Sequence, residues 1–225
     1  MNATDTTTKR PSLWIVALVL VYTAVVLTVD TLAVSRSRLL IDWTLFRWNW
    51  GHGFDGFKFV CWFLIPFAYA LRGLDWGAFT FRGWKRVDWV LIALVLAVGA
   101  AAFVVIPMVP SLRADYGTGS RVPSSDRFEY AMIQLLWTAS WLPGWEFLHR
   151  YVLTRTVTAR WASYGWLIVP LFEGLYHIQK SWPETALMVV FSVIATRWAI
   201  KRSNVLLPFL AHLIVEVAVI LYLVL

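Results

Sequence analysis

Residues 89–112 read WVLIALVLAVGAAAFVVIPMVPSL, a run that contains no Lys, Arg, Asp, Glu or His. As a helix at about 1.5 Å per residue, this run is long enough to cross a hydrocarbon core of roughly 30 Å. Residues 13–29 and 130–145 lack the same five residue types. Such runs are typical of helices that span a membrane, because a helix satisfies its backbone hydrogen bonds without water.

The composition of the whole chain favours the same fold class. Hydrophobic residues make up 60% of the 225 residues and charged residues only 15%, whereas roughly a quarter of a soluble domain is charged. We therefore expect an all-α, polytopic membrane bundle of about seven transmembrane helices, with six to eight allowed by the pattern. Pro143-Gly144 can either kink one of these helices or divide it in two. The predicted helices are residues 12–34, 57–72, 88–111, 128–158, 162–180, 184–201 and 204–225.

The sequence is expected to form one membrane domain with three parts. Residues 1–11 are polar and predict a disordered tail, residues 12–127 predict membrane anchor helices, and residues 128–225 predict a catalytic-type helical core. Within the second part, LLIDWTLFRWNWGHGFDGF at 39–57 is rich in Trp with single charges, which is typical of an amphipathic segment at the membrane interface. The polar stretch LRADYGTGSRVPSSDRFE at 112–129 predicts an extended connection.

The formal charge of +7 does not indicate nucleic-acid binding, because the basic residues are scattered and never form a block. Positive loops that face anionic membrane lipids explain this charge more simply. For seven spans, 11 positive residues fall on one side of the membrane and 8 on the other, so the orientation stays open. Cys61 is the single cysteine, which excludes an internal disulfide and any multi-cysteine metal site.

Charged side chains inside apolar helices are costly, so those present usually face the protein interior and pair with one another. Three predicted helices each carry a carboxylate and an imidazole at helical spacing: Glu146 with His149, Glu173 with His177, and His212 with Glu216. Arg150 follows Glu146 by four residues on the same face. Any one of these sets can be a packing lock without chemistry. Because three of the four histidines lie in these helices, we expect the sets to converge on one pocket, where a carboxylate takes a proton from water.

Three motifs in this half resemble a known family. WEFLHRYVL at 145–153, LYHIQKSWPE at 175–184 and ATRWAIKRSNVLLPFLAHLIVE at 195–216 are similar to the CAAX-protease and bacteriocin-processing family of membrane-embedded peptidases. The motifs of that family are Glu-Glu-x-x-x-Arg, Phe-x-x-x-His and His-x-x-x-Asn/Asp. The resemblance covers about residues 128–225 and implies a helical membrane bundle with a water-filled cavity.

The resemblance also implies roles for particular residues. A glutamate activates water, which makes Glu146 or Glu184 the candidate base. His177 and His212 polarise water or hold the oxyanion, while Arg150 and Glu216 orient the site. The chain departs from the family pattern where Trp145 replaces the first Glu, Glu173 replaces the Phe, Glu216 replaces the terminal Asn or Asp, and His149 stands where an aromatic residue is common.

The preferred hypothesis is therefore an endopeptidase within a bacterial or archaeal cell membrane. Its substrate is a peptide or protein, and one form of the hypothesis has a substrate that is lipidated or membrane-anchored. This mechanism needs no cofactor. Trp145 motivates an alternative, a non-catalytic immunity or partner-binding membrane protein. A third hypothesis is a Zn, di-iron or other divalent metal site, because imidazoles and carboxylates at this spacing suit such ions. Its candidate ligands are Glu146, His149, Glu173, His177, His212 and Glu216.

Overall fold

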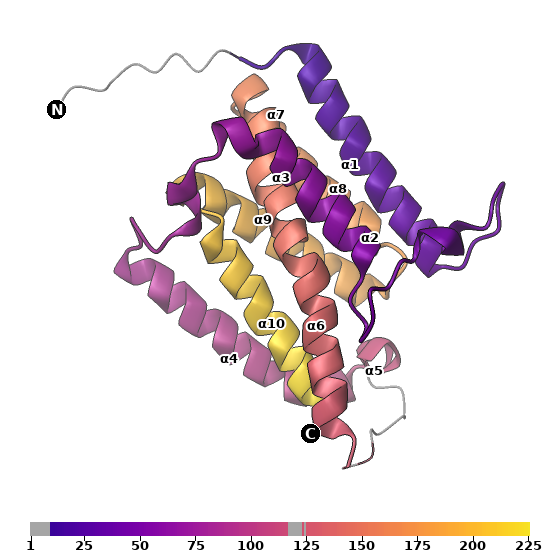
Figure 1. Cartoon of the computed structure of the whole chain (residues 1–225). Helices are drawn as coiled ribbons and strands as arrows, with labels where there is room; N and C mark the ends of the chain where they lie inside the picture. The colour runs from indigo at the N-terminus through magenta and orange to yellow at the C-terminus, as the bar shows by residue number, and fades with distance from the viewer. Residues whose placement is uncertain (1–9, 117–122, 124) are drawn as a thin grey trace.

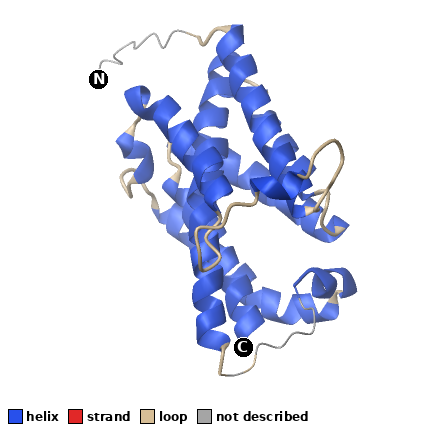
Figure 2. Cartoon of the chain, turned by 45° about the vertical axis from the view of Figure 1, so that its right-hand side comes forward, coloured by secondary structure: helices blue, strands red, loops and turns tan. Residues whose placement is uncertain are grey.

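The structure, a computed structural model, describes residues 10–116, 123 and 125–225. Within these ranges the chain is helical and contains no strand beyond an isolated bridge between Asn49 and Asp55 (Figures 1 and 2). The predicted all-α membrane bundle is confirmed. The predicted disordered tail lies outside the described residues except for its last two positions.

The N-terminal half contains two long helices and a helix of mixed type. Helix α1, Leu13–Val34, begins after Ser12, whose hydroxyl accepts a hydrogen bond from the Ile15 amide. The predicted helix over 57–72 is one continuous segment made of α2, a π-helix and α3: Gly56–Lys58, Phe59–Leu64 and Ile65–Ala70. After short 3₁₀ turns at Leu71–Gly73 and Trp76–Phe79, α4 spans Arg86–Met108 and α5 spans Pro110–Tyr116.

Helix α5 corrects the prediction that residues 112–129 form an extended connection. Pro110 starts this helix at a position where a proline costs no hydrogen bond, and the helix continues to Tyr116. The middle of the predicted connection lies outside the described residues. The Trp-rich segment before α2 forms a 3₁₀ turn at Trp43–Phe46 and exposes Leu39, Leu40 and Trp50. Exposed apolar and aromatic side chains beside a long helix suit the predicted interfacial location.

The C-terminal half carries the remaining helices. Helix α6, Arg127–Glu146, continues without a break into a π-helix at Phe147–Leu153 and then into α7, Thr154–Arg160. After a 3₁₀ turn at Gly165–Leu167, the chain forms α8, α9 and α10: Ile168–His177, Trp182–Arg202 and Leu206–Val224. The prediction for 162–180 was too long. Helix α8 has 10 residues, about 15 Å, which is half of a membrane crossing.

Four helices of the described residues, α1, α4, α9 and α10, are long and apolar enough to cross a membrane by themselves. The predicted seven helical segments are all present, but α8, the mixed helix α2–α3 and α6 do not meet this criterion alone. Helix α6 has a lower share of apolar side chains, since it includes Arg127, Glu129, Gln134 and Glu146. The chain is an integral membrane protein.

Pro143-Gly144 neither divides α6 nor ends it, so of the two predicted outcomes the two-helix one is wrong. Helix α6 continues to Glu146, and the irregular π-helix starts just after it. Gly144 is needed for a close approach, because a Cβ atom there would lie 2.9 Å from the Trp62 carbonyl carbon. Trp62 belongs to the other π-helix, so two widened helical turns face each other in the centre of the bundle.

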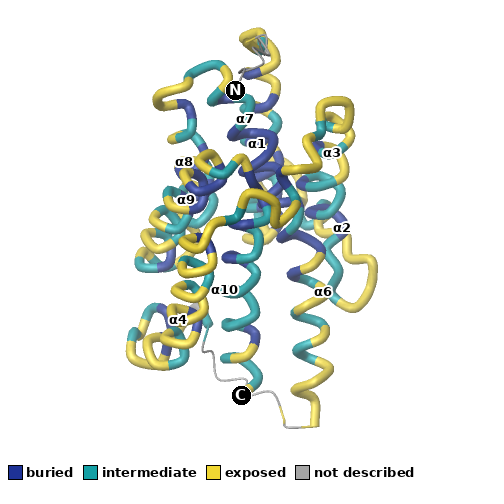
Figure 3. The backbone as a smooth tube through the Cα atoms, turned by 90° about the vertical axis from the view of Figure 1, so that its left-hand side faces the viewer, coloured by how far each residue is buried: buried dark blue, intermediate teal, exposed yellow. Residues whose placement is uncertain are grey.

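The helices pack around this centre. Helix α10 lies between α4 and α6, and α8 packs along α9 (Figure 1). Buried residues gather where α1, α2 and α8 surround the end of α6, whereas the start of α6 and much of α4 are exposed (Figure 3). A buried polar contact fixes α4 against α9, since Asp88 Oδ1 accepts hydrogen bonds from Trp198 Nε1 and Arg202 Nε, each at 2.8 Å.

Candidate functional site

The last residue of α6 meets the middle of α10 through a carboxylate and an imidazole. Glu146 Oε1 lies 2.7 Å from His212 Nδ1. The other ring nitrogen, His212 Nε2, lies 3.7 Å from Glu216 Oε1, one helical turn further along α10. His212 is therefore held between two carboxylates, each facing a different ring nitrogen. The predicted pair of His212 and Glu216 is present in this geometry.

A second group of charges lies on the other side of Glu146 and is completely buried. Arg150 donates to both carboxylate oxygens of Glu173 on α8, from Nη1 to Oε1 and from Nη2 to Oε2, the latter at 2.9 Å. Arg150 Nε lies 3.5 Å from Glu146 Oε2. The implied contact between Arg150 and Glu146 is thus present, but the two-pronged hydrogen bond that fixes the guanidinium goes to Glu173.

His149 belongs to the same buried group. Its Nδ1 lies 2.9 Å from the Trp145 carbonyl oxygen and 4.0 Å from Glu173 Oε1. Glu146 interacts electrostatically with His149, as the spacing predicts. Glu173, predicted to pair with His177, instead contacts Arg150 and His149, because α8 packs against the π-helix.

The third group lies where α8 ends and α9 begins. His177 is the last residue of α8, and its Nδ1 lies 3.6 Å from Glu184 Oε1 in the first turn of α9. Lys180 Nζ lies 3.7 Å from the same oxygen. The turn is fixed by the Thr185 hydroxyl, which donates to the His177 carbonyl oxygen at 2.7 Å. Glu184 Oε2 makes no hydrogen bond with the described part of the chain.

The groups are close enough to form one site, as expected. The Glu216 carboxylate interacts electrostatically with His177, Glu184 and Lys180 as well as with its neighbour His212. His212 in turn interacts with both Glu146 and Glu173. Carboxylates and imidazoles from α6, α8, α9 and α10 thus surround a common region, and the more exposed side chains lie at the His177 end.

A comparison with protein families agrees with this geometry. Residues 128–218 match the family described as type II CAAX prenyl endopeptidase Rce1-like. This segment belongs to the Rce1-like family. The matched residues include every member of the three groups, from Glu146 to Glu216, and the likeness to a CAAX prenyl endopeptidase is limited to this segment. No curated protein and no solved structure matches the chain.

Trp145 occupies the position of the first motif glutamate in the Rce1-like pattern. Its indole is buried, with ring centroids 4.2 Å from His149, 5.1 Å from Tyr176 and 6.1 Å from His177. On its far side it contacts Trp62, at 5.3 Å. An aromatic ring therefore lies beside His177, and Glu184 is the carboxylate that contacts His177.

The predicted metal ligands do not form a metal-binding set. Among the described residues, no group of three His, Cys, Asp or Glu side chains is arranged to hold a metal ion. Within the candidate set, both oxygens of Glu173 are taken by the Arg150 guanidinium, whose positive charge opposes a cation at the same place.

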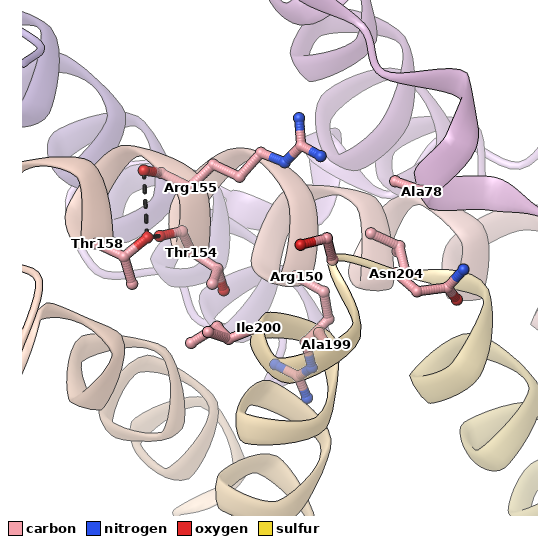
Figure 4. Close-up of a pocket in the computed structure, with 10 residues that line it drawn as sticks. Ala78, Arg150, Thr154, Arg155, Thr158, Ala199, Ile200 and Asn204 are labelled. Carbon is pink, nitrogen blue, oxygen red and sulfur yellow. Dashed lines mark hydrogen bonds between the residues drawn. The ribbon is translucent and has the colours of Figure 1, made fainter. Parts of the chain in front are cut away.

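A cavity of about 150 Å³ borders Arg150. It lies between three segments: the π-helix Phe147–Leu153, helix α7, and the turn from α9 to α10. Its walls include Thr154, Thr158 and Asn204, and Arg155 extends away from it (Figure 4). Asn204 is already engaged, since its amide group donates to the Thr80 carbonyl and accepts from the Leu207 amide. This cavity borders the buried Arg150 and is separate from the contact between His177 and Glu184.

Sequence reasoning missed a polar network at the edge of this site. Asp30 of α1 accepts a hydrogen bond from the Tyr176 hydroxyl at 2.5 Å and lies 3.5 Å from Lys58 Nζ. The signal was available, because LTVDTLAV at 27–34 places a carboxylate in an otherwise apolar span. The interpretation of residues 12–127 as anchor helices passed over it.

Proposed function

We propose that the chain is a membrane-embedded endopeptidase in which Glu184 activates a water molecule beside His177. The observation that carries the proposal is the pair of His177 and Glu184, which faces His212 and Glu216 within an Rce1-like segment. A general base needs a free oxygen and access to water. Glu184 Oε2 is buried but makes no hydrogen bond with the described residues, and the neighbouring His177 side chain is 16% exposed, which is the side from which we propose that water reaches it.

Glu146 fits the role of base less well. Its side chain is only 1% exposed, and its Oε1 is engaged by His212. We assign Glu146 the task of orienting His212, so that His212 Nε2 is directed toward Glu216. The buried ion pair of Arg150 and Glu173 supports this arrangement from the protein interior.

The proposed reaction is the hydrolysis of a peptide bond. Glu184 Oε2 takes one proton from water as the oxygen attacks the substrate carbonyl carbon. The oxyanion that forms accepts hydrogen bonds from the imidazoles of His177 and His212. The carbonyl is restored when the C–N bond breaks, and Glu184 returns the proton to the leaving amine.

The test uses the full chain reconstituted in lipid vesicles with a synthetic peptide that ends in a farnesylated Cys-x-x-x sequence. Release of the terminal tripeptide is followed by mass spectrometry. We expect release by the wild type and a loss of about 10³-fold in rate for Glu184→Gln, because the base is removed while the shape is kept. The control is Glu129→Gln, the same substitution at an exposed position of α6. Full activity of Glu184→Gln would refute this mechanism.

The same assay contains a test of lipid dependence. An otherwise identical peptide without the farnesyl group is cleaved at the same rate if the chain recognises peptide alone, and more slowly if the prenyl chain contributes to binding. The proposal of peptide hydrolysis stands under either result, and the comparison decides whether the substrate is lipidated.

A second candidate function is supported by Trp145. This residue fills the position of the first motif glutamate, which favours a non-catalytic membrane protein that binds a partner. Under this alternative the wild type releases no tripeptide, and Trp145→Glu gains release because it restores the acid pair of the family motif. Release by the wild type that depends on Glu184 rejects the alternative.

A further inference from the structure

Helix α1 carries a buried carboxylate that reaches the candidate site. Asp30 is 3% exposed and is the single Asp or Glu of α1. Its Oδ2 accepts a hydrogen bond from the hydroxyl of Tyr176 on α8 and lies 3.5 Å from Lys58 Nζ at the end of α2. Lys58 is also buried, with its ammonium 4.9 Å from the centre of the Trp62 ring. Three segments of the chain thus meet at one acid.

A carboxylate in an apolar span is held tightly by its partners. Charged side chains within an apolar span are costly, and they normally face the protein interior and pair with other groups. Tyr176 and Lys58 are the two partners that the structure gives Asp30. The Tyr176 ring is therefore fixed relative to α1, although its own helix is only ten residues long.

Tyr176 passes this restraint to His177, which follows it in sequence. The Tyr176 ring meets the His177 imidazole edge to face, with centroids 5.4 Å apart at 77°. Tyr176 also contacts Trp145 at 5.1 Å, and Trp145 meets His177 at 6.1 Å and 89°. Two aromatic rings therefore bound one side of His177, while Glu184 lies at its Nδ1.

We propose that Asp30 is a positioning residue for His177: through the Tyr176 hydroxyl it fixes the end of α8 and so sets the imidazole against Glu184. The role of His177 in this statement rests on the proposed function. The placement itself does not, and it is tested without any substrate. In this arrangement the N-terminal half of the chain completes the site, although the Rce1-like match begins only at residue 128.

The main variant is Tyr176→Phe, which removes one hydroxyl and keeps the ring. Its matched control is Tyr22→Phe, because the Tyr22 hydroxyl also ties α1 to a neighbouring segment, donating to the Cys61 carbonyl at 2.5 Å rather than to a group next to His177. Asp30→Asn is the second variant. Its control is Asp88→Asn, a buried carboxylate that is likewise paired with a cation and an aromatic side chain.

The substrate-free readout is the rate at which diethyl pyrocarbonate modifies each histidine, measured by peptide mass spectrometry in vesicles. The chain has four histidines, and exposed His52 serves as the internal reference. We expect His177 to react at least about threefold faster in Tyr176→Phe and in Asp30→Asn, with no change in the two controls, because one hydrogen bond of ordinary strength is lost. An unchanged His177 rate in Tyr176→Phe, or an equal change in Tyr22→Phe, overturns the proposal.

The catalytic readout separates this proposal from the proposed function. If the wild type cleaves the farnesylated peptide, Tyr176→Phe is expected to lower kcat about tenfold and leave KM nearly unchanged, since a misplaced catalytic group loses rate rather than binding. Adding Asp30→Asn to Tyr176→Phe is expected to lower kcat no further, because Asp30 acts through that hydroxyl. A further tenfold loss would contradict the proposed route. If the wild type cleaves nothing, the proposed function fails, and the modification rates still decide whether Asp30 positions His177.

Discussion

The two carboxylate–imidazole contacts of the site differ in closeness and in exposure to water. Glu146 and His212 are 2.7 Å apart, with side chains 1% and 5% exposed. Glu184 and His177 are 3.6 Å apart, with side chains 8% and 16% exposed. The first pair has the distance of a formed hydrogen bond and connects α6 to α10, whereas the second is too long for one. On this contrast rests our proposal that the first pair serves structure and the second serves chemistry.

Breaking the driest ion pair is expected to have the largest effect on stability. In Glu173→Gln the amide oxygen can accept one hydrogen bond from Arg150, but the neutralising charge is lost and Glu146, at 3.5 Å, is the carboxylate left beside the buried guanidinium. Removing one charge of a buried ion pair costs about 3–5 kcal/mol. The free energy of unfolding is measured in mixed micelles by tryptophan fluorescence, with Glu129→Gln as the control. A loss below about 1 kcal/mol would mean that Arg150 finds another partner and that this end of the site is not a structural lock.

The pair of Glu146 and His212 is expected to respond less strongly. In Glu146→Gln the amide oxygen can still accept a hydrogen bond from His212, so the variant should lose about 1–2 kcal/mol of unfolding free energy. Hydrolysis should fall far less than in Glu184→Gln. The two substitutions together test the contrast between the pairs: Glu184→Gln should mainly lower the rate, and Glu146→Gln should mainly lower stability. The opposite result would make Glu146 the base.

Much of this arrangement is predictable from the sequence. Charge-free runs predicted the positions of α1, α4 and most of α6, because apolar side chains at every position are tolerated only in a membrane or a fully buried helix. The convergence of acids and imidazoles was predictable for the same reason, since such groups need partners in an apolar environment. Glu184 was named as an alternative base from its place after Lys180 and Pro183, and it does contact His177.

The exact partners were not predictable. Spacing along one helix placed Arg150 beside Glu146, and the two are 3.5 Å apart, but it did not show that the Arg150 guanidinium makes its two hydrogen bonds with Glu173. Glu173 faces Arg150 rather than His177 because α8 packs against the π-helix, a tertiary contact that spacing along one helix does not contain. Asp30 was missed for a related reason. An acid in an apolar span indicates a buried polar contact, but its partners, Lys58 and Tyr176, lie on other helices and the sequence does not name them.

An exposed ion pair gives the lower limit for the effect of breaking an ion pair on stability. Arg155 Nη2 lies 2.9 Å from Asp75 Oδ2, but the two side chains are 40% and 52% exposed. In Asp75→Asn the side chain can still accept the hydrogen bond that Asp75 Oδ1 receives from the Gly77 amide, so only the ion pair is lost. We expect a change of at most about 1 kcal/mol in unfolding free energy, because solvent screens the pair and ordering two side chains costs entropy. The same change should shrink further when the salt concentration is raised. A loss as large as that of Glu173→Gln would show that distance rather than burial decides the strength of these pairs, and it would remove the basis for assigning structure to Glu146 and chemistry to Glu184.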